Sequence, residues 1–249
     1  MLGWLLSQHP HVTITHEHRS FLQLGAPRAA YLAVVRADDH IARPLVPLRR
    51  GNRLLGPFIS WWYAQRFNSL VRRAASPEVT IEELAAHYAR LFPNRLLVGD
   101  KFPRYVFKLE RLLSHRSLIG LVIYRDPRDV VVSTLRQTAG AWRDKPFRQR
   151  LDTPAKIAAK WVEAVKMLEA NQQRLLSVRY EELVTRPEAV LRQLASELGL
   201  EPLWGRINGV RTASIGRYRD ELTLEQIEEV ESIAGQMMQR LGYRQLTAA

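Results

Sequence analysis

Short apolar runs that alternate with stretches of helical periodicity constrain the fold of this chain more than any other feature. The runs at residues 95–99, 117–124 and 174–180 have the length and apolar character of buried strands. Between and after them, apolar residues recur every three or four positions, as on one face of a helix. Strands that alternate with helices predict an α/β fold of three layers, a parallel sheet with helices on both faces. Ligands of such folds bind at the carboxyl ends of the strands.

The helices are predicted from their N-terminal signals and from the apolar stripes that follow. The predicted starts are the capping-box pairs Thr80/Glu83 and Thr223/Gln226, Thr153 before Pro154, and Thr185 before Pro187. The stripes, such as Ile157, Trp161 and Val165, are typical of helices that pack on a core rather than of cofactor contacts.

Composition limits the classes of protein that fit. The chain has 249 residues, 46% of them hydrophobic, which favours one domain over residues 1–249. Its net charge of +12 indicates an anionic partner, but does not choose among nucleic acid, acidic glycan, anionic lipid and phosphorylated cofactor. With no cysteine, disulfides, thiolate nucleophiles and cysteine-ligated metals are excluded. No apolar stretch approaches the roughly 18 residues of a membrane span, so we expect a cytoplasmic protein.

Residues 41–75 fit the alternating pattern poorly. Prolines interrupt this segment, arginines charge it, and Trp61, Trp62 and Tyr63 stand in its middle. We interpret it as a helical insertion over the acceptor side of the sheet. The aromatic residues either pack within the insertion or contact the acceptor, and the sequence leaves both open.

The sharpest motif is Val-Ile-Tyr-Arg-Asp-Pro-Arg-Asp-Val-Val-Val-Ser at residues 122–133. A strand is predicted to end at Tyr124, and Asp126 can cap the helix that follows. Arg125 and Ser133 then both face the carboxyl edge of that strand, where a guanidinium, a hydroxyl and a helix N-terminus can bind a phosphate. The alternative is a surface ion pair followed by a core helix, and the motif alone does not decide between the two.

Arg125 and Ser133, eight residues apart across a strand-to-helix turn, resemble the 3′-phosphate-binding motif of the sulfotransferases that use 3′-phosphoadenosine 5′-phosphosulfate (PAPS). Asp100-Lys101-Phe-Pro, directly after the first predicted strand, is similar to the Lys-x-Pro turn of that family. Tyr180 corresponds by resemblance to the tyrosine that reaches the adenine. Ser214-Ile-Gly-Arg-Tyr-Arg resembles the loop that closes over the nucleotide, with Arg217 as its cation. This ordered resemblance covers nearly the whole chain and is weakest at residues 22–90.

The resemblance, closest to bacterial and tyrosylprotein-type members, implies a P-loop nucleoside-triphosphate-hydrolase-like fold. It also implies PAPS as co-substrate without a metal, and transfer of a sulfuryl group to a hydroxyl or amine acceptor. Lys101 would then stabilise the departing 5′-phosphate; the alternative is a solvated lysine at a strand end. The acceptor stays open among protein tyrosine, glycan, lipid and small phenol.

Glu17 stands where the tyrosylprotein-type branch places its catalytic glutamate, which takes the proton of the acceptor hydroxyl. The alternative is a surface carboxylate paired with Arg19. His16 and His18 are alternative bases. A metal site made of these two histidines with His9 and His11 is a poor alternative, because the spacing fits no closed site.

The strongest motif of the family, a first strand followed by an Arg-Ser-Gly-Thr-Thr loop that holds the 5′-phosphosulfate, does not occur in the sequence. Residues 1–10 instead resemble the helix that follows this loop, including its His-Pro turn. We expect a chain that starts here to be inactive. Either the reading frame upstream of Met1 encodes the strand and loop, which we favour, or the chain is a remnant that no longer turns over.

Rivals from other classes have less support. A non-catalytic basic module that binds nucleic acid or another anionic polymer is supported by charge alone, since no nucleic-acid motif is visible. A P-loop kinase fails on the missing Gly-x-x-x-x-Gly-Lys-Ser/Thr. Binding of 3′,5′-adenosine bisphosphate would support the sulfotransferase, binding of polymer only the basic module, and binding of ATP the kinase.

Overall fold

The structure, a computed structural model, describes residues 1–37, 56–205, 207, 210 and 212–246. The chain divides into two compact units, unit 1 with residues 1–118 and 191–207, and unit 2 with residues 119–190 and 208–249. Each unit is described by itself. The single domain expected over residues 1–249 stays a prediction.

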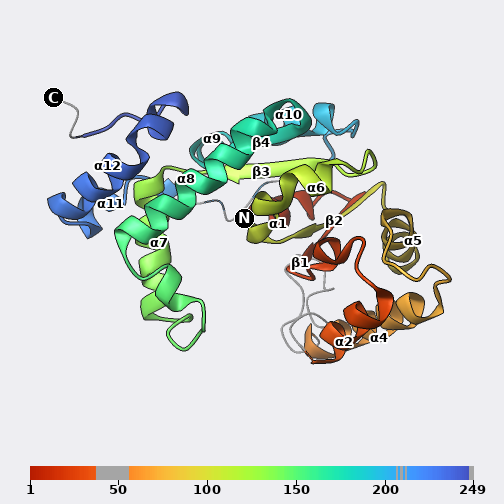
Figure 1. Cartoon of the computed structure of the whole chain (residues 1–249). Coiled ribbons are helices and arrows are strands. Elements are labelled where there is room, and N and C mark those ends of the chain that lie inside the picture. Colours follow the sequence, from red (N-terminus) through yellow and green to blue (C-terminus); the bar gives the residue numbers. More distant parts are fainter. Residues whose placement is uncertain (38–55, 206, 208–209, 211, 247–249) are drawn as a thin grey trace. The chain divides into compact units, whose positions relative to one another are not determined.

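Unit 1 is built around a pair of parallel strands (Figure 1). Its elements are α1 (Leu2–Leu6), β1 (Val12–His16), η1 (Ser20–Gln23), α2 (Arg28–Ala37), α4 (Gly56–Arg73), α5 (Ile81–Leu91), β2 (Leu97–Lys101), η3 (Pro103–Lys108) and α6 (Leu109–Leu113). Val12 pairs with Leu97 and His16 with Lys101, so both strands end at the same edge. Strand β1 was missed by the sequence reasoning, although Val-Thr-Ile-Thr is a β-branched, alternating run typical of a strand.

The core of unit 1 joins α4 and α5 to the strands. Phe67 of α4 and Leu84 and Tyr88 of α5 are fully or almost fully buried in it. Helix α5 begins as the sequence predicts, because the Thr80 side chain accepts the backbone N–H of Glu83. This core therefore packs α4 and α5 against each other and against Val98 of β2.

Unit 2 contains the second parallel pair. Its elements are β3 (Gly120–Tyr124), α7 (Pro127–Ala139), η4 (Arg148–Arg150), α8 (Pro154–Ala170), η5 (Gln172–Arg174), β4 (Leu175–Arg179), α9 (Tyr180–Thr185), η6 (Thr212–Ser214), α11 (Tyr218–Glu221) and α12 (Leu224–Arg240). Helix α10 (Pro187–Glu197) begins in the residues of unit 2 and ends in those of unit 1. The strands pair from Gly120 with Leu175 to Tyr124 with Arg179. The described strands thus form two two-stranded parallel sheets, and the predicted α/β class is confirmed.

The predicted helix starts are confirmed at α7, α8 and α12. Asp126 accepts the N–H of Arg128 at 3.0 Å, Thr153 caps α8, and Thr223 with Gln226 forms a complete capping box. Thr185, by contrast, does not cap α10. It is the last residue of α9, and its hydroxyl donates to the carbonyl of Glu181 one turn earlier. The short helix at residues 180–185 engages this hydroxyl before α10 begins.

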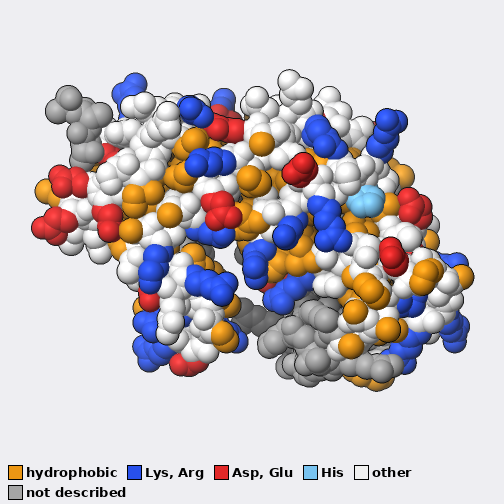
Figure 2. Space-filling model, viewed as in Figure 1, with side chains coloured by type: hydrophobic (Ala, Val, Ile, Leu, Met, Phe, Trp, Pro, Cys, Tyr) orange, Lys and Arg blue, Asp and Glu red, His pale blue; other side chains and the backbone are white. Residues whose placement is uncertain are grey.

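The expected insertion at residues 41–75 is described only in part. Residues 38–55 lie outside the described residues, and α4 occupies most of the rest. Its position over the acceptor side stays a prediction. None of the described helices is long and apolar enough to cross a membrane. Blue Lys and Arg side chains are spread over the face of the molecule in Figure 2, as the net charge of +12 leads one to expect.

Candidate functional site

In unit 1 the parallel pairing of β1 with β2 brings Glu17 and Lys101 together. Glu17 directly follows β1, and its N–H donates to the carbonyl of Lys101 at 2.8 Å, which extends the strand pairing by one residue. The ammonium of Lys101 then donates to Oε1 of Glu17 at 2.6 Å. Both side chains are partly exposed, 31% for Glu17 and 37% for Lys101. The two predicted catalytic residues, Glu17 for the acceptor proton and Lys101 for the departing 5′-phosphate, are thus direct partners at the carboxyl edge of the strands.

The turn that carries Glu17 is held by Asp100. Glu17 and Arg19 have φ values of 57° and 64°, in the left-handed region that residues other than glycine rarely adopt. The Asp100 carboxylate accepts the N–H groups of His18 at 3.0 Å and Arg19 at 2.9 Å, which stabilises this turn. The motif Asp100-Lys101 predicts a role for the lysine only, so the function of Asp100 emerges from the structure.

Two hydroxyl groups complete the surroundings of Asp100. Thr15 of β1 donates to Oδ1 at 2.7 Å, and Tyr105 of η3 donates to Oδ2 at 2.6 Å. A carboxylate that accepts this many hydrogen bonds is a rigid anchor rather than a proton acceptor for substrate. Its position immediately before the predicted lysine, at the end of a strand, is the signal that could have found it.

The histidines around Glu17 differ in their surroundings. His18 is 1% exposed, its ring lies edge-on to Phe67 with 4.6 Å between the centroids, and Nδ1 is 3.3 Å from the Tyr88 hydroxyl. Burial lowers the pKa of His18 to about 4, so it is neutral at pH 7 and faces the core. His16 is half exposed, with Nε2 3.8 Å from Glu17 Oε1, and burial and Lys101 lower its pKa. Of the two alternative bases, His16 is the one beside Glu17.

His9 is a structural residue. Its Nδ1 accepts the N–H of His11 at 3.1 Å, and Nε2 lies 2.8 Å from the carbonyl of Glu201, to which it donates in that tautomer. Both ring nitrogens are therefore engaged. Across residues 1–37, 56–205, 207, 210 and 212–246, no group of three or more His, Asp or Glu side chains is arranged to hold a metal.

In unit 2 Arg125 follows β3 and lies within a cluster of predicted nucleotide-binding groups. Its guanidinium lies 4.4 Å from the centroid of the Tyr180 ring and donates to the carbonyl of Ser214. The Tyr180 hydroxyl is 2.5 Å from the Ser214 hydroxyl. Trp161 of α8 donates to the Arg125 carbonyl at 2.9 Å and fixes the backbone. The structure thus brings together the arginine predicted for the phosphate, the tyrosine predicted for the adenine, and the predicted closing loop.

The guanidinium of Arg125 is not saturated by these contacts. Its Nε is buried and has no hydrogen-bond partner among the described residues. Asp129, one turn into α7, pairs with a terminal nitrogen at 3.3 Å. A buried guanidinium donor without an acceptor is uncommon, and it is the group that an anionic ligand would satisfy.

Ser133 and Arg217 lie on the two segments that flank this cluster. Ser133 is exposed on α7, one turn after Asp129, and therefore lies on the same helix face as the carboxylate that pairs with Arg125. Arg217 precedes α11, and its Nε donates to the carbonyl of Ala213 at 2.9 Å. Its side chain is thus tied to the segment that carries Ser214.

Acidic residues that the sequence reasoning left without a role organise this cluster. Asp129 is 1% exposed and accepts the N–H groups of Gly216 and Tyr218. Glu181, directly after Tyr180, accepts the N–H of Asp126 at 3.0 Å and the hydroxyl of Tyr243 at 3.0 Å. Both follow a predicted ligand residue closely in sequence, at the carboxyl end of a strand, which is the signal that could have found them.

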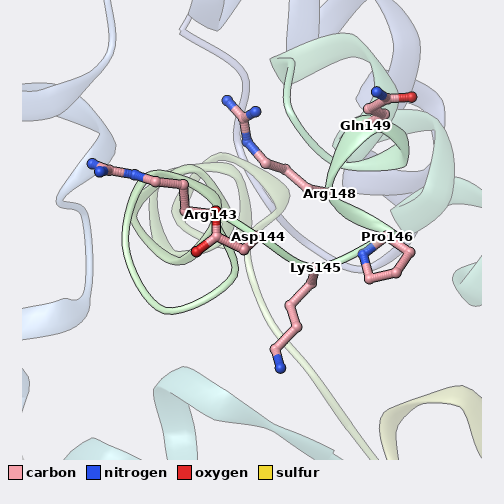
Figure 3. A pocket seen from close by; sticks show the side chains of 6 residues that line it. All are labelled: Arg143, Asp144, Lys145, Pro146, Arg148 and Gln149. Atoms are coloured by element: carbon pink, nitrogen blue, oxygen red, sulfur yellow. The ribbon is translucent and has the colours of Figure 1, made fainter.

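A shallow pocket elsewhere in unit 2 contains none of the predicted site residues. It is lined by Arg143, Asp144, Lys145, Pro146, Arg148 and Gln149, all from the stretch between α7 and α8 (Figure 3). The side chains spread apart instead of converging on one point. The candidate functional residues therefore form two groups, one at the strand edge of unit 1 and one at the strand edge of unit 2.

Comparisons with known proteins agree with this fold. A model of the sulfotransferase family matches residues 1–205. The sulfotransferase domain from the olefin synthase of Synechococcus PCC 7002 has a TM-score of 0.58 and 19% identity, over 94% of this chain and 89% of that one. The sulfotransferase domain from the curacin biosynthetic pathway has a TM-score of 0.50 and 17% identity, over 94% and 97%.

Sulfotransferase STF9 from Mycobacterium avium is also similar, with a TM-score of 0.50 and 15% identity over 98% of this chain and 74% of that one. At such identities the likeness shows the fold alone, and it confirms the sulfotransferase fold predicted from the sequence. Comparison with curated proteins finds no match.

Proposed function

The chain belongs to the sulfotransferase family, and we propose that it moves a sulfuryl group from PAPS to a hydroxyl or amine acceptor by in-line displacement. The observation that carries the proposal is Arg125, a strand-end guanidinium that lies over Tyr180 and whose buried Nε has no hydrogen-bond partner in the described part of the chain. A nucleotide with a 3′-phosphate offers both the anion for the guanidinium and the ring for the tyrosine.

The donor-binding roles follow from the chemistry of the groups in unit 2. Arg125 forms charge-assisted hydrogen bonds to the 3′-phosphate, and the hydroxyl of Ser133 adds a neutral one. The N-terminus of α7 supports the same charge, because the first turn of a helix attracts anions. Tyr180 contacts the adenine, and Arg217 supplies the cation of the closing loop.

The chemical roles belong to the pair in unit 1. The acceptor oxygen or nitrogen forms a bond to sulfur while the bond between sulfur and the bridging oxygen of the donor breaks, so that 3′,5′-adenosine bisphosphate leaves. Lys101 stabilises the charge that develops on the departing 5′-phosphate, and Glu17 takes the acceptor proton. The ammonium of Lys101 has three N–H donors and uses one of them for Glu17 at 2.6 Å, so it can also donate to the departing phosphate.

The test is calorimetric titration with 3′,5′-adenosine bisphosphate. Arg125→Ala removes a charged hydrogen-bonding group and is expected to weaken binding by about 1.5–3 kcal/mol, or roughly 10- to 150-fold. Arg136→Ala is the matched control, because Arg136 lies on α7, the helix that follows Arg125, in an exposed ion pair with Glu221. Equal affinities of the wild type and Arg125→Ala would refute the donor assignment.

The net charge of +12 supports a second candidate, a non-catalytic module that binds an anionic polymer. Such a module depends on the sum of its surface charges, so Arg125→Ala and Arg136→Ala would weaken polymer binding alike. Binding of polymer without any affinity for 3′,5′-adenosine bisphosphate would favour this candidate over the sulfotransferase.

A further inference from the structure

Asp129 is the most completely engaged carboxylate next to the predicted phosphate-binding arginine. Its side chain is 1% exposed. Oδ2 accepts the N–H of Gly216 at 2.8 Å and lies 3.3 Å from a terminal nitrogen of Arg125, and Oδ1 accepts the N–H of Tyr218 at 3.2 Å. All of these residues belong to unit 2. One buried carboxylate thus joins α7 to the arginine and to the segment before α11.

Helix capping does not account for Asp129. Asp126 already serves as the N-cap of α7, since its side chain accepts the N–H of Arg128. Burying a carboxylate is costly unless hydrogen bonds and an opposite charge compensate it. The contacts that compensate Asp129 all come from residues that flank the predicted nucleotide site.

The segment that Asp129 holds contacts the predicted ligand residues itself. Ser214 accepts from Arg125 with its carbonyl, and its hydroxyl lies 2.5 Å from that of Tyr180. Gly216 has a φ of 75°, a conformation that glycine adopts without strain, and in it the N–H donates to Asp129. Fixing Gly216 and Tyr218 therefore also fixes Ser214 and Arg217, on either side of the glycine.

We propose that Asp129 is a positioning residue of the 3′-phosphate site, which holds the Arg125 guanidinium and segment 214–218 in the arrangement that binds the phosphate. This inference rests on the proposed function. Arginine loses much rotamer freedom when it is ordered, and a partner that orders it in the free protein reduces that loss on binding. The simpler role, a counter-ion for Arg125, leads to the opposite result, because removing a negative charge beside a phosphate strengthens binding.

The experiment measures how much the 3′-phosphate contributes to affinity. The dissociation constant of 5′-AMP divided by that of 3′,5′-adenosine bisphosphate gives this contribution, and calorimetry supplies both. In Asp129→Asn the side chain keeps its size, but it loses the ion pair and turns an amide N–H toward one of the backbone donors. We expect the ratio to fall by about tenfold, equivalent to about 1.4 kcal/mol, with the affinity for 5′-AMP nearly unchanged.

Asp220→Asn is the matched control, because it removes the same charge from an exposed position on α11. It is expected to leave the ratio at the wild-type value. A merely structural role of Asp129 would weaken both nucleotides together. An unchanged or increased ratio in Asp129→Asn would overturn the positioning role, whereas a wild type that does not distinguish the two nucleotides would overturn the proposed donor site as well.

Asp129→Glu provides a second variant with the charge retained. The extra methylene displaces the carboxylate from the two N–H groups, so a positioning role predicts a reduced ratio and a counter-ion role a normal one. Hydrogen exchange in the wild type needs no variant. The amides of Gly216 and Tyr218 are expected to be protected before any nucleotide is added, and rapid exchange at both would overturn the proposal.

Discussion

At the scale of single residues, two predicted cations of the candidate site, Lys101 and Arg125, lie next to carboxylates. Lys101 pairs with Glu17 and follows Asp100, which holds the turn that carries Glu17. Arg125 pairs with Asp129, which also holds the segment that carries Ser214. The cations themselves can be recognised from their local motifs. Asp100 and Asp129 acquire a role only when distant segments meet, so the sequence motifs leave these two carboxylates without one.

Replacing Glu17 with Gln tests the base. The amide cannot take the proton of the acceptor, so turnover in the complete gene product is expected to fall by roughly 10²–10⁴. Affinity for 3′,5′-adenosine bisphosphate should change little, because Glu17 acts on the acceptor. Steady-state kinetics and calorimetry measure the two quantities.

Lys101→Ala is the comparison for Glu17→Gln. It should reduce turnover and also weaken binding of the intact donor, since the ammonium contacts a phosphate oxygen before the reaction. Near-normal turnover of Glu17→Gln would transfer the role of base to His16, the partly exposed histidine beside it. Near-normal turnover of Lys101→Ala would remove the leaving-group role.

The burial of His18 predicts a pH dependence of stability. Its folded pKa of about 4 lies below the unfolded value of 6.5, so the unfolded chain binds the proton more readily. This contribution to stability is complete above pH 6.5 and is lost as the pH falls toward 4. The loss amounts to about 2–3 kcal/mol at pH 4.5. The Asp100 carboxylate opposes this lowering of the pKa, and the Tyr88 hydroxyl lies 3.3 Å from Nδ1 of the ring.

Urea unfolding at about pH 7.5 and about pH 4.5 measures this effect. The wild type should lose more stability between the two pH values than His18→Gln, which does not titrate there. Equal losses in the two proteins would mean that His18 is protonated in the folded state. Carboxylates titrate in both proteins, so their effect on stability cancels when the two losses are compared.

At the scale of secondary-structure elements, α4 shows how one helix divides its aromatic residues. Phe67 is fully buried in the core of unit 1, and Tyr63 packs with its ring centroid 5.1 Å from that of Phe92. Trp61 and Trp62, on the other side, are 56% and 41% exposed. Of the two interpretations from sequence, packing therefore holds for Tyr63. Acceptor contact by Trp61 and Trp62 stays a prediction.

This division predicts unequal effects of alanine substitutions within α4. Phe67→Ala opens a cavity against His18 and Tyr88 and is expected to lower the free energy of unfolding by about 3–5 kcal/mol. Trp61→Ala, on the exposed side, should change it by no more than about 0.5 kcal/mol. Denaturant unfolding of both variants checks the pair. A large loss in Trp61→Ala would show that this side of α4 is covered in the folded protein.

At the scale of the whole molecule, binding through general surface charge and binding through specific contacts depend differently on salt concentration. The chain carries 37 Lys and Arg against 25 Asp and Glu. A surface of this kind attracts polyanions through many exposed charges, which salt screens efficiently. The Arg125 side chain is only 16% exposed and acts at contact distance, where screening is weaker.

Raising the salt concentration from about 0.05 M to about 0.5 M should therefore abolish binding to a polyanion such as heparin, and weaken binding of 3′,5′-adenosine bisphosphate only several-fold. Titrations at both salt concentrations measure this difference. Equal loss of the two affinities would indicate that the nucleotide binds through general surface charge, as the basic-module candidate requires.

The sequence alone determined the features that depend on neighbouring residues. The starts of α5, α7, α8 and α12 follow from side chains that hydrogen-bond within their own first turn, and β3 and β4 lie in the predicted apolar runs. Strand β2 begins in the run at residues 95–99 and extends past it, so that Lys101, expected directly after the strand, is its last residue. The placement of Arg125 between β3 and α7 follows from the same local signals. Thr185 shows their limit, because a capping residue can equally well bond to a preceding turn.

Tertiary structure decided the contacts that give the candidate site its geometry. Glu17 meets Lys101 because β1 pairs in parallel with β2, and this pairing joins residues far apart in sequence. Asp129 meets Gly216, and Tyr180 meets Ser214, only once the segment before α11 has folded back onto α7 and α9. Propensities and caps act over a few residues along the chain. Hydrogen bonds between residues far apart in sequence depend on strand register and packing, which no local pattern encodes.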